Sequence, residues 1–189
     1  LGRVDGVIVS TPTSSHADVL DEVLPLGVPM FVEKPLCNDA ERAQDLANRA
    51  PDRLFVMDKW RYHPGVQMLA TMARQGDLGE VLGVRTRRVG WGTNHDDVDA
   101  VWVLTPHDLS IGLEILGHLP APRAAVAEWN GTRVGGMQAL LGTHPWLAVE
   151  VSELSPVNVR VVEVHGREAM ARLDGGWDEH VTLVRRGQP

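Results

Sequence analysis

Three short, continuous apolar runs in the first sixty residues constrain the fold more than any other feature of this sequence. They occupy residues 6–10, 29–33 and 53–58, and each is flanked by segments with a different hydrophobic period. Continuous apolar runs of this length are typical of strands that are buried on both faces of a parallel sheet. We therefore expect a parallel sheet at the start of the chain.

The segments between these runs have the period of amphipathic helices. Apolar residues recur at helical spacing over residues 16–26 and 40–50, and Gly27 closes the first segment. Asn38 and Glu41 form the pattern of a capping box at the start of the second helix. Strand, helix, strand, helix and strand with short connections predict an α/β fold, namely the C-terminal half of a Rossmann-like, doubly wound parallel sheet.

The pattern changes after Asp58. A helix is predicted over residues 64–76, a long alternating strand over 81–91, and a further helix over 108–116. Strands joined by tight turns pair antiparallel, so we expect an α+β domain with a large, mostly antiparallel sheet. The turn signals that follow residue 124 are Asn130-Gly131, His165-Gly166 and Gly175-Gly176. We place the boundary between residues 1–60 and residues 61–189, and leave open an extension of the second domain beyond the given C-terminus.

Composition excludes several classes of function. Eighteen basic and twenty-five acidic residues give a formal charge of −7, and no Lys/Arg-rich run is present, so we expect no nucleic-acid partner. No apolar run approaches the roughly 20 residues of a membrane helix, and Cys37 is the single cysteine, which favours a cytoplasmic protein. Since Leu1 is not an initiating methionine and a strand follows almost directly, we expect a piece of a longer protein.

Distinctive residues follow two of the predicted strands. Glu33-Lys34-Pro35 comes after the second strand and Thr11-Pro12 after the first. Ligands of open parallel sheets bind outside the carboxyl ends of the strands, so both segments belong to the expected binding edge. Only two of the eighteen basic residues are lysines, Lys34 and Lys59, and lysine differs from arginine because it can lose its proton in apolar surroundings. A solvated strand end is the simpler interpretation of Lys34.

These segments resemble the Gfo/Idh/MocA oxidoreductases. The stretch DGVIVSTPTSSHADVLDEVLPLGVPMFVEKPL (residues 5–36) is similar to the TP…H and EKP pattern of that family. The likeness continues through WRYHPGVQMLATMARQGDLGEVLGVRTRR, WVLTPHDLSIGLEILG and VEVHGREAMARLD, and so covers the whole chain. It implies a partial dinucleotide-binding domain followed by a substrate and oligomerisation domain.

The resemblance implies hydride transfer between NAD or NADP and a hydroxyl carbon of a sugar, cyclitol or nucleotide-sugar. It also implies a homo-oligomer formed through the antiparallel sheet. Two alternatives stay open: a non-catalytic module that binds a cofactor or sugar, and a module that only dimerises through its sheet. Activity of this segment alone is doubtful in any case.

Residue roles follow from the same resemblance. Lys34 matches the lysine of EKP and His107 the histidine at the start of the active-site helix, which makes these two the catalytic candidates. His107 and its neighbour Asp108 are also candidates for binding the substrate, together with Arg61 and Trp91, although hinge packing and core packing would equally explain the last two. The residues expected to contact the cofactor are Ser10, Thr11, Pro12, His16, Glu33, Lys34 and Pro35.

The sequence departs from the family pattern at two places. Val103 stands where the family usually has an aspartate, four residues before His107, so His107 is expected to be a weaker base or only a hydrogen-bond donor. The G-x-G-x-x-G turn that receives the pyrophosphate is absent from these residues. His95-Asp96-Asp97 has no partner at a spacing diagnostic of metal ligands, and we predict no metal site.

Overall fold

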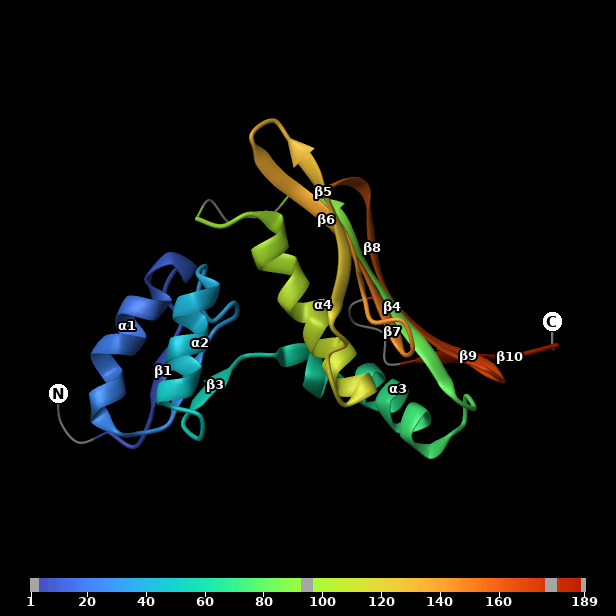
Figure 1. The fold of residues 1–189 in the computed structure, drawn as a ribbon, viewed down its shortest axis with the longest axis horizontal. Helices are drawn as coiled ribbons and strands as arrows, with labels where there is room; N and C mark the ends of the chain where they lie inside the picture. Colours follow the sequence, from blue (N-terminus) through green and yellow to red (C-terminus); the bar gives the residue numbers. More distant parts are fainter. Residues whose placement is uncertain (1–3, 93–96, 176–179, 188–189) are drawn as a thin grey trace.

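A computed structural model describes residues 4–92, 97–175 and 180–187 of the chain. Figure 1 shows two lobes, a small one that contains the N-terminus and a larger one built on an extended sheet, with the helix α4 facing the small lobe. Within the described residues, no helix is long and apolar enough to cross a membrane.

The small lobe is a three-stranded parallel sheet in the order β1-β2-β3. Val7 lies opposite Met30, and Met30 lies opposite Leu54, so the three strands are in step. This arrangement confirms the predicted parallel sheet. The elements of this lobe are β1 (Val7–Val9), η1 (Thr13–Ser15), α1 (His16–Val23), η2 (Leu24–Leu26), β2 (Met30–Val32), α2 (Ala40–Arg49) and β3 (Leu54–Val56).

Only one face of the small sheet is buried, which corrects the expectation of strands covered on both sides. The buried face packs against α1 and α2 through residues such as Leu20, Met30 and Leu46. On the other face Ile8 and Phe55 are 78% and 49% exposed, because no helix among the described residues covers it. The continuous apolar runs are those of a two-sided sheet, whereas the described chain supplies helices for one side.

The start of α2 also differs from the prediction. Asp39, rather than Asn38, is the N-cap, and its side chain accepts a hydrogen bond from the backbone N–H of Arg42. Glu41 is therefore at the second helical position, and the predicted capping box does not form. Ala40, the first helical residue, is exposed. Neighbouring Asn and Asp are equally good caps, so sequence alone did not distinguish them.

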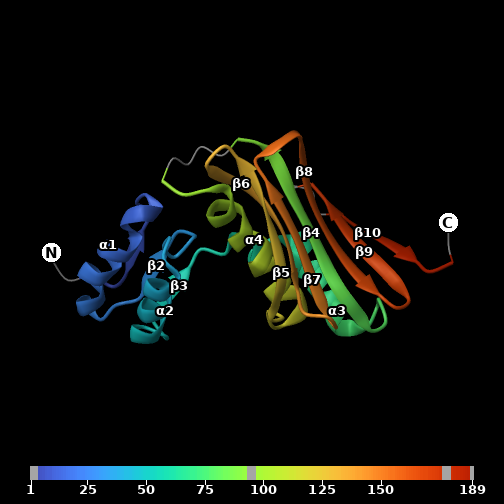
Figure 2. The ribbon, with the colours of Figure 1, turned by 45° about the horizontal axis from the view of Figure 1, so that its top comes forward.

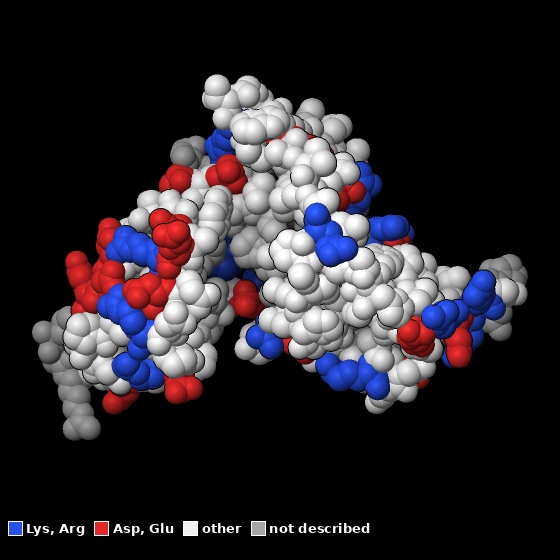
Figure 3. All heavy atoms as spheres, viewed as in Figure 1, with Lys and Arg blue, Asp and Glu red and all other residues white. Residues whose placement is uncertain are grey.

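Ion pairs join the outer surfaces of α1 and α2. Arg42 contacts both Asp18 and Asp21 at 2.8 Å, and Arg49 contacts Asp21 at 2.6 Å. Figure 3 shows the resulting mixture of acidic and basic side chains on the small lobe, and a hollow between the two lobes. Exposed pairs of this kind contribute about 0–1 kcal/mol each, so the lobe depends mainly on its apolar core.

The large lobe is built on a seven-stranded sheet in the order β10-β9-β8-β4-β7-β6-β5. Neighbouring strands are antiparallel except for β4 and β7, which are parallel. The prediction of a mostly antiparallel sheet is confirmed. Its elements are η3 (Lys59–Tyr62), α3 (Pro64–Gln75), β4 (Val81–Trp91), α4 (Ala100–Leu116), β5 (Pro122–Asn130), β6 (Arg133–Leu141), β7 (Trp146–Ser152), β8 (Leu154–Gly166), β9 (Ala169–Asp174) and β10 (Val181–Arg185).

Helices α3 and α4 lie on one face of the large sheet (Figures 1 and 2). Leu69 from α3 and Ile111 from α4 meet Val84 and Leu147 of the sheet in a single core, and all four are fully buried. Trp60 belongs to this core as well, although it precedes the predicted boundary. By core membership, the division between the lobes therefore falls just before η3.

Helix α4 is longer than predicted. It begins at Ala100, and the Asp99 carboxylate caps it by accepting from the N–H groups of Val101 and Trp102 at 2.9 and 3.2 Å. The predicted helix began at Asp108. Pro106 usually ends a helix, whereas here it lies inside one. His107 is consequently in the middle of α4 and not at its start.

Candidate active site

The ends of β1 and β2 lie side by side at the carboxyl edge of the small sheet. Val9 is opposite Val32, and the N–H of Glu33 donates to the Val9 carbonyl at 2.9 Å, so the segments after these residues emerge together. The predicted cofactor residues at this edge differ in accessibility. Pro35 is buried and Lys34 is half-buried, whereas the exposed ones are Ser10, Thr11, Pro12 and Glu33.

The side chain of His16 contacts both the segment after β1 and the segment after β2. Its Nδ1 lies 3.0 Å from the Pro35 carbonyl oxygen and its Nε2 lies 2.8 Å from that of Thr11. The residue is only 1% exposed. The ring therefore has no free surface for a cofactor, and we correct its expected role: His16 positions the two loops, while their exposed residues form the surface. It does not cap α1 with its side chain, since Ser15 is the N-cap.

The side chain of Lys34 reaches across to the large lobe. Its Nζ donates a hydrogen bond to the main-chain carbonyl of Val103 in α4, at 3.1 Å. Burial lowers the pKa of this amine below its usual value, and the positive charges of Lys59 and Arg88 add to the effect, while Glu33 opposes it. At a given pH, a larger fraction of Lys34 is therefore in the neutral form than of a solvated lysine.

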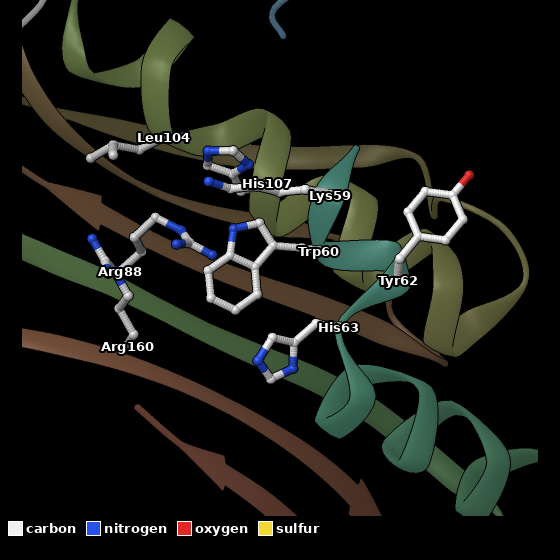
Figure 4. Close-up of a pocket in the computed structure, with 8 residues that line it drawn as sticks. All are labelled: Lys59, Trp60, Tyr62, His63, Arg88, Leu104, His107 and Arg160. Atoms are coloured by element: carbon white, nitrogen blue, oxygen red, sulfur yellow. The ribbon is translucent and has the colours of Figure 1, made fainter. Parts of the chain in front are cut away.

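A cavity of about 320 Å³ lies between α4, η3 and the strands β4 and β8, and Figure 4 shows its wall. Basic and aromatic side chains form most of this wall, and none of its residues is acidic. The cavity is large enough for a sugar-sized ligand. Its lining residues are Lys59, Trp60, Tyr62, His63, Arg88, Leu104, His107 and Arg160.

Trp60 is at the centre of this wall. Its ring stacks on His63 at 5.2 Å between centroids and meets His107 edge-on at 6.4 Å, as Figure 4 illustrates. The Arg88 guanidinium lies 4.5 Å from the centroid of the same ring, a cation–π distance. The indole Nε1 is buried and has no hydrogen-bond partner within the described residues. Trp60 therefore fixes the mutual placement of two histidines and an arginine.

Asp108 lies behind the cavity and not on its surface. Its Oδ2 accepts a hydrogen bond from Arg88 Nε at 2.8 Å, and both side chains are buried. Asp108 is 1% exposed, so the expectation that it binds the substrate is corrected. Since a buried guanidinium needs a compensating charge, the function of Asp108 is to hold Arg88 in place.

His107 is poised as a neutral ring. It is 8% exposed, and burial together with the charges of Arg88, Lys34, Lys59 and Arg160 lowers its pKa from 6.5 to about 2. Within the described parts of the chain, no hydrogen-bond partner engages its side chain. An uncharged imidazole with free nitrogens can donate a hydrogen bond to a ligand hydroxyl through one nitrogen or accept one from it through the other.

Arg61 and Trp91 lie apart from the main cavity. Arg61 Nε contacts Glu114 of α4 at 3.1 Å, so its side chain is engaged in holding η3 against the helix, and its predicted contact with the substrate is not supported by this geometry. Trp91 is 75% exposed and lines a smaller cavity of about 50 Å³. The smaller cavity shares Arg88, Leu104 and Arg160 with the larger one. Trp91 therefore lies next to the larger cavity without lining it.

Sequence reasoning missed Arg88 and Arg160. A signal was available for Arg88, because Val84, Thr86 and Arg88 alternate along β4 and all three are buried under the helices. An arginine at an inward position of an alternating strand indicates a buried charge with a partner. No group of three potential metal ligands occurs among the described residues. Of the segment considered for metal binding, His95 and Asp96 lie outside those residues.

Comparison with known proteins identifies relatives of both lobes. Residues 1–57 match the GFO_IDH_MocA family model, which describes an oxidoreductase family with an NAD-binding Rossmann fold. UDP-N-acetylglucosamine 3-dehydrogenase of Acidithiobacillus ferrooxidans is 32% identical over 130 residues, which are 67% of this chain and 40% of that enzyme. The chain thus spans well under two thirds of this relative.

Solved structures share the whole arrangement. The structure of the Acidithiobacillus ferrooxidans enzyme has a TM-score of 0.79 at 25% identity and covers 96% of this chain and 61% of its own. An inositol dehydrogenase homologue from Azotobacter vinelandii, solved with NADH and myo-inositol, has a TM-score of 0.83 at 20% identity. It covers 98% of this chain and 55% of that one, and at this identity it shows the fold alone.

Proposed function

This chain belongs to the Gfo/Idh/MocA family of oxidoreductases, and on that premise we propose that it contributes the catalytic half of a dehydrogenase. The reaction transfers a hydride between NAD or NADP and a hydroxyl carbon of a sugar, cyclitol or nucleotide-sugar. The observation that carries the proposal is the hydrogen bond from Lys34 to Val103, which brings the lysine to α4 one turn before His107.

The exposed strand ends suit one end of a dinucleotide. Ser10, Thr11 and Pro12 follow β1, and Glu33 follows β2 at the same level, which is the edge where open parallel sheets bind ligands. A dinucleotide bound there supplies a nicotinamide ring that accepts or releases the hydride. The protein then has to bind the alcohol beside Lys34 and exchange its proton.

Lys34 is the group that we propose for that exchange. When the alcohol is oxidised, its carbon loses a hydride and its oxygen loses a proton, and the neutral amine of Lys34 accepts that proton. The lowered pKa of Lys34 makes the neutral amine available. His107, held neutral, hydrogen-bonds the reacting oxygen, and the nearby Arg88 stabilises negative charge that develops on it.

The proposal is tested by following NADH absorbance when the purified protein that contains these residues is mixed with NAD⁺ and each member of a substrate panel. The panel contains neutral sugars, cyclitols, sugar acids and nucleotide-sugars. We expect NAD⁺ reduction with at least one of them. Saturable NADH binding without reduction by any member would instead support the non-catalytic module.

We also propose a homo-oligomer that forms through the face of the large sheet opposite α3 and α4. Among the described residues nothing covers this face, and Val126, Leu140 and Val184 are exposed on it. Arg87 pairs with Glu150 on the same face, so its central charges are compensated within the chain. A second copy could bury the apolar residues without leaving a charge unpaired.

Sedimentation velocity of the wild type and of Leu140→Lys tests this assembly. We expect a dimer or larger species for the wild type and a monomer for the variant. Leu26→Lys, a matched change of an exposed leucine on the small lobe, should leave the assembly intact. A monomeric wild type at micromolar concentration would refute the proposal.

A further inference from the structure

Two arginines face each other directly across neighbouring strands of the cavity wall. Arg88 of β4 is the register partner of Arg160 of the antiparallel strand β8. Both side chains point to the side of the sheet that carries α4, as seen in Figure 4. Like charges at directly opposite positions destabilise a sheet, so this pair calls for a compensating negative charge.

Among the described residues, only one of the two arginines has a direct ion-pair partner. Asp108 pairs with Arg88 at 2.8 Å. Arg160 makes no ion pair or side-chain hydrogen bond within the described residues. Partial burial and the charge of Arg88 lower the pKa of Arg160, while the charge of Asp108 opposes this shift. The Arg160 side chain is exposed to the cavity. A cation in this position is therefore available to an external anion.

The rest of the wall adds donors and no carboxylate. Lys59 brings another ammonium group, and the buried Trp60 Nε1–H has no acceptor among the described residues. Lysine, arginine and indole groups donate hydrogen bonds and accept none. Acceptor capacity in this wall is limited to the Tyr62 hydroxyl and the rings of His63 and His107. Burial, together with the surrounding positive charges, lowers the pKa of His107.

We propose that this cavity binds an oxyanion group of the substrate, a carboxylate or a phosphate, with Arg160 and Lys59 as its principal partners. The fork of Arg160 matches the two oxygens of either group. The inference rests on the proposed function, which supplies the sugar or cyclitol part of the substrate. It narrows this substrate class to members that carry a negative charge. Neutral sugars would leave the Arg88–Arg160 repulsion in place.

Isothermal titration calorimetry of the full chain without cofactor tests the proposal. The probes are D-glucuronate for a carboxylate, inorganic phosphate for a phosphate, and D-glucose as the neutral match of glucuronate. We expect at least one anion to bind and glucose to bind more weakly by at least about tenfold, equivalent to about 1.4 kcal/mol. The anion that binds more tightly identifies which source the site prefers.

Two matched variants locate the binding. Arg160→Gln removes the charge in the cavity, and Arg85→Gln removes the same charge from β4 on the opposite face, where Arg85 lies 3.8 Å from Glu163. Arg160→Gln should weaken the anion at least tenfold and Arg85→Gln should leave its affinity unchanged. Circular dichroism confirms that both variants fold. Equal affinities in both variants, or no preference for an anion over glucose, would overturn the inference.

The outcome is separable from that of the dehydrogenase assay. Anion binding lost with Arg160→Gln, in a protein that reduces no NAD⁺, would uphold the anion site and reject the reaction. Oxidation of a neutral sugar as fast as of any acid, with no anion bound, would uphold the reaction and reject the site.

Discussion

The amine of Lys34 and the main-chain carbonyl of Val103 form a hydrogen bond of 3.1 Å between the two lobes. The family resemblance leads one to expect an aspartate at position 103, and valine has no side-chain acceptor. The backbone of α4 provides an acceptor at this position instead. Because Val103 and His107 are one helical turn apart, the contact sets the lysine beside the histidine.

The rate of alcohol oxidation should rise with pH and level off below the ordinary lysine range. Lys34 must be neutral to accept the proton, and burial lowers its pKa from 10.5. Below that pKa, kcat/KM should increase about tenfold per pH unit. A profile of kcat/KM against pH measures this. A profile that keeps rising past pH 10.5, the ordinary pKa of lysine, would contradict the shift.

His107 should make the folded protein less stable in mild acid. Its folded pKa, about 2, is below the unfolded value of 6.5, so only the unfolded state gains this proton as the pH falls below 6.5. The stability contributed by the neutral ring is complete above that pH and decreases by roughly 1.4 kcal/mol per unit below it. Urea unfolding at several pH values measures the slope for the wild type and His107→Gln.

In that comparison the variant should lose stability less steeply, because a glutamine takes up no proton. All other titrating groups are shared by the two proteins and cancel in the difference. Identical slopes between about pH 6.5 and 5 would mean that His107 titrates normally in the folded protein.

Asp108→Asn should destabilise the fold by about 3–5 kcal/mol, because it leaves the buried guanidinium of Arg88 without a counter-charge. The matched change Asp45→Asn removes an exposed carboxylate that pairs with Arg49, and should cost under about 1 kcal/mol. Urea unfolding provides both values. Similar costs for the two changes would show that the buried pair contributes no more than a surface one.

His16→Ala should loosen the two strand-end loops. The carbonyls of Thr11 and Pro35 lose their common partner, at a cost of about 1–3 kcal/mol, and we expect weaker NADH binding in a fluorescence titration. His144→Ala is the control, since His144 pairs with Glu80 on the surface of the large lobe. Unchanged NADH affinity in His16→Ala would separate this histidine from the cofactor loops.

Local patterns predicted the elements of the fold but not the way in which the lobes are covered. The apolar runs around Val9, Met30 and Leu54 and the Asn130-Gly131 turn correspond to observed strands and a hairpin. The exposed faces of Ile8 and Phe55 could not be predicted, because burial of a strand depends on elements elsewhere in the chain. The first half of α4 was not predicted. Pro106 is a local signal for the end of a helix, yet the observed helix begins at the Asp99 cap and continues through this proline.

For the candidate site, the strand-end residues could be predicted because the fold class itself determines where ligands bind, and their contact with a cofactor stays a prediction. Burial could not be predicted in the same way. His16 and Asp108 both lie near the candidate site, but their side chains are buried and cannot contact a ligand. Arg160 was missed because its importance depends on lying opposite Arg88 across two strands, and a register is not visible in either segment alone.

The hydride-transfer rate of Lys34→Ala is the most direct test of the proposed site. Single-turnover measurements of NADH absorbance, with the substrate identified from the panel, should show a loss of about 10²–10⁴-fold relative to the wild type. Arg49→Ala, which removes a surface cation from α2, should retain the wild-type rate. If Lys34→Ala, correctly folded, transfers hydride as fast as Arg49→Ala, then Lys34 does not take part in the reaction.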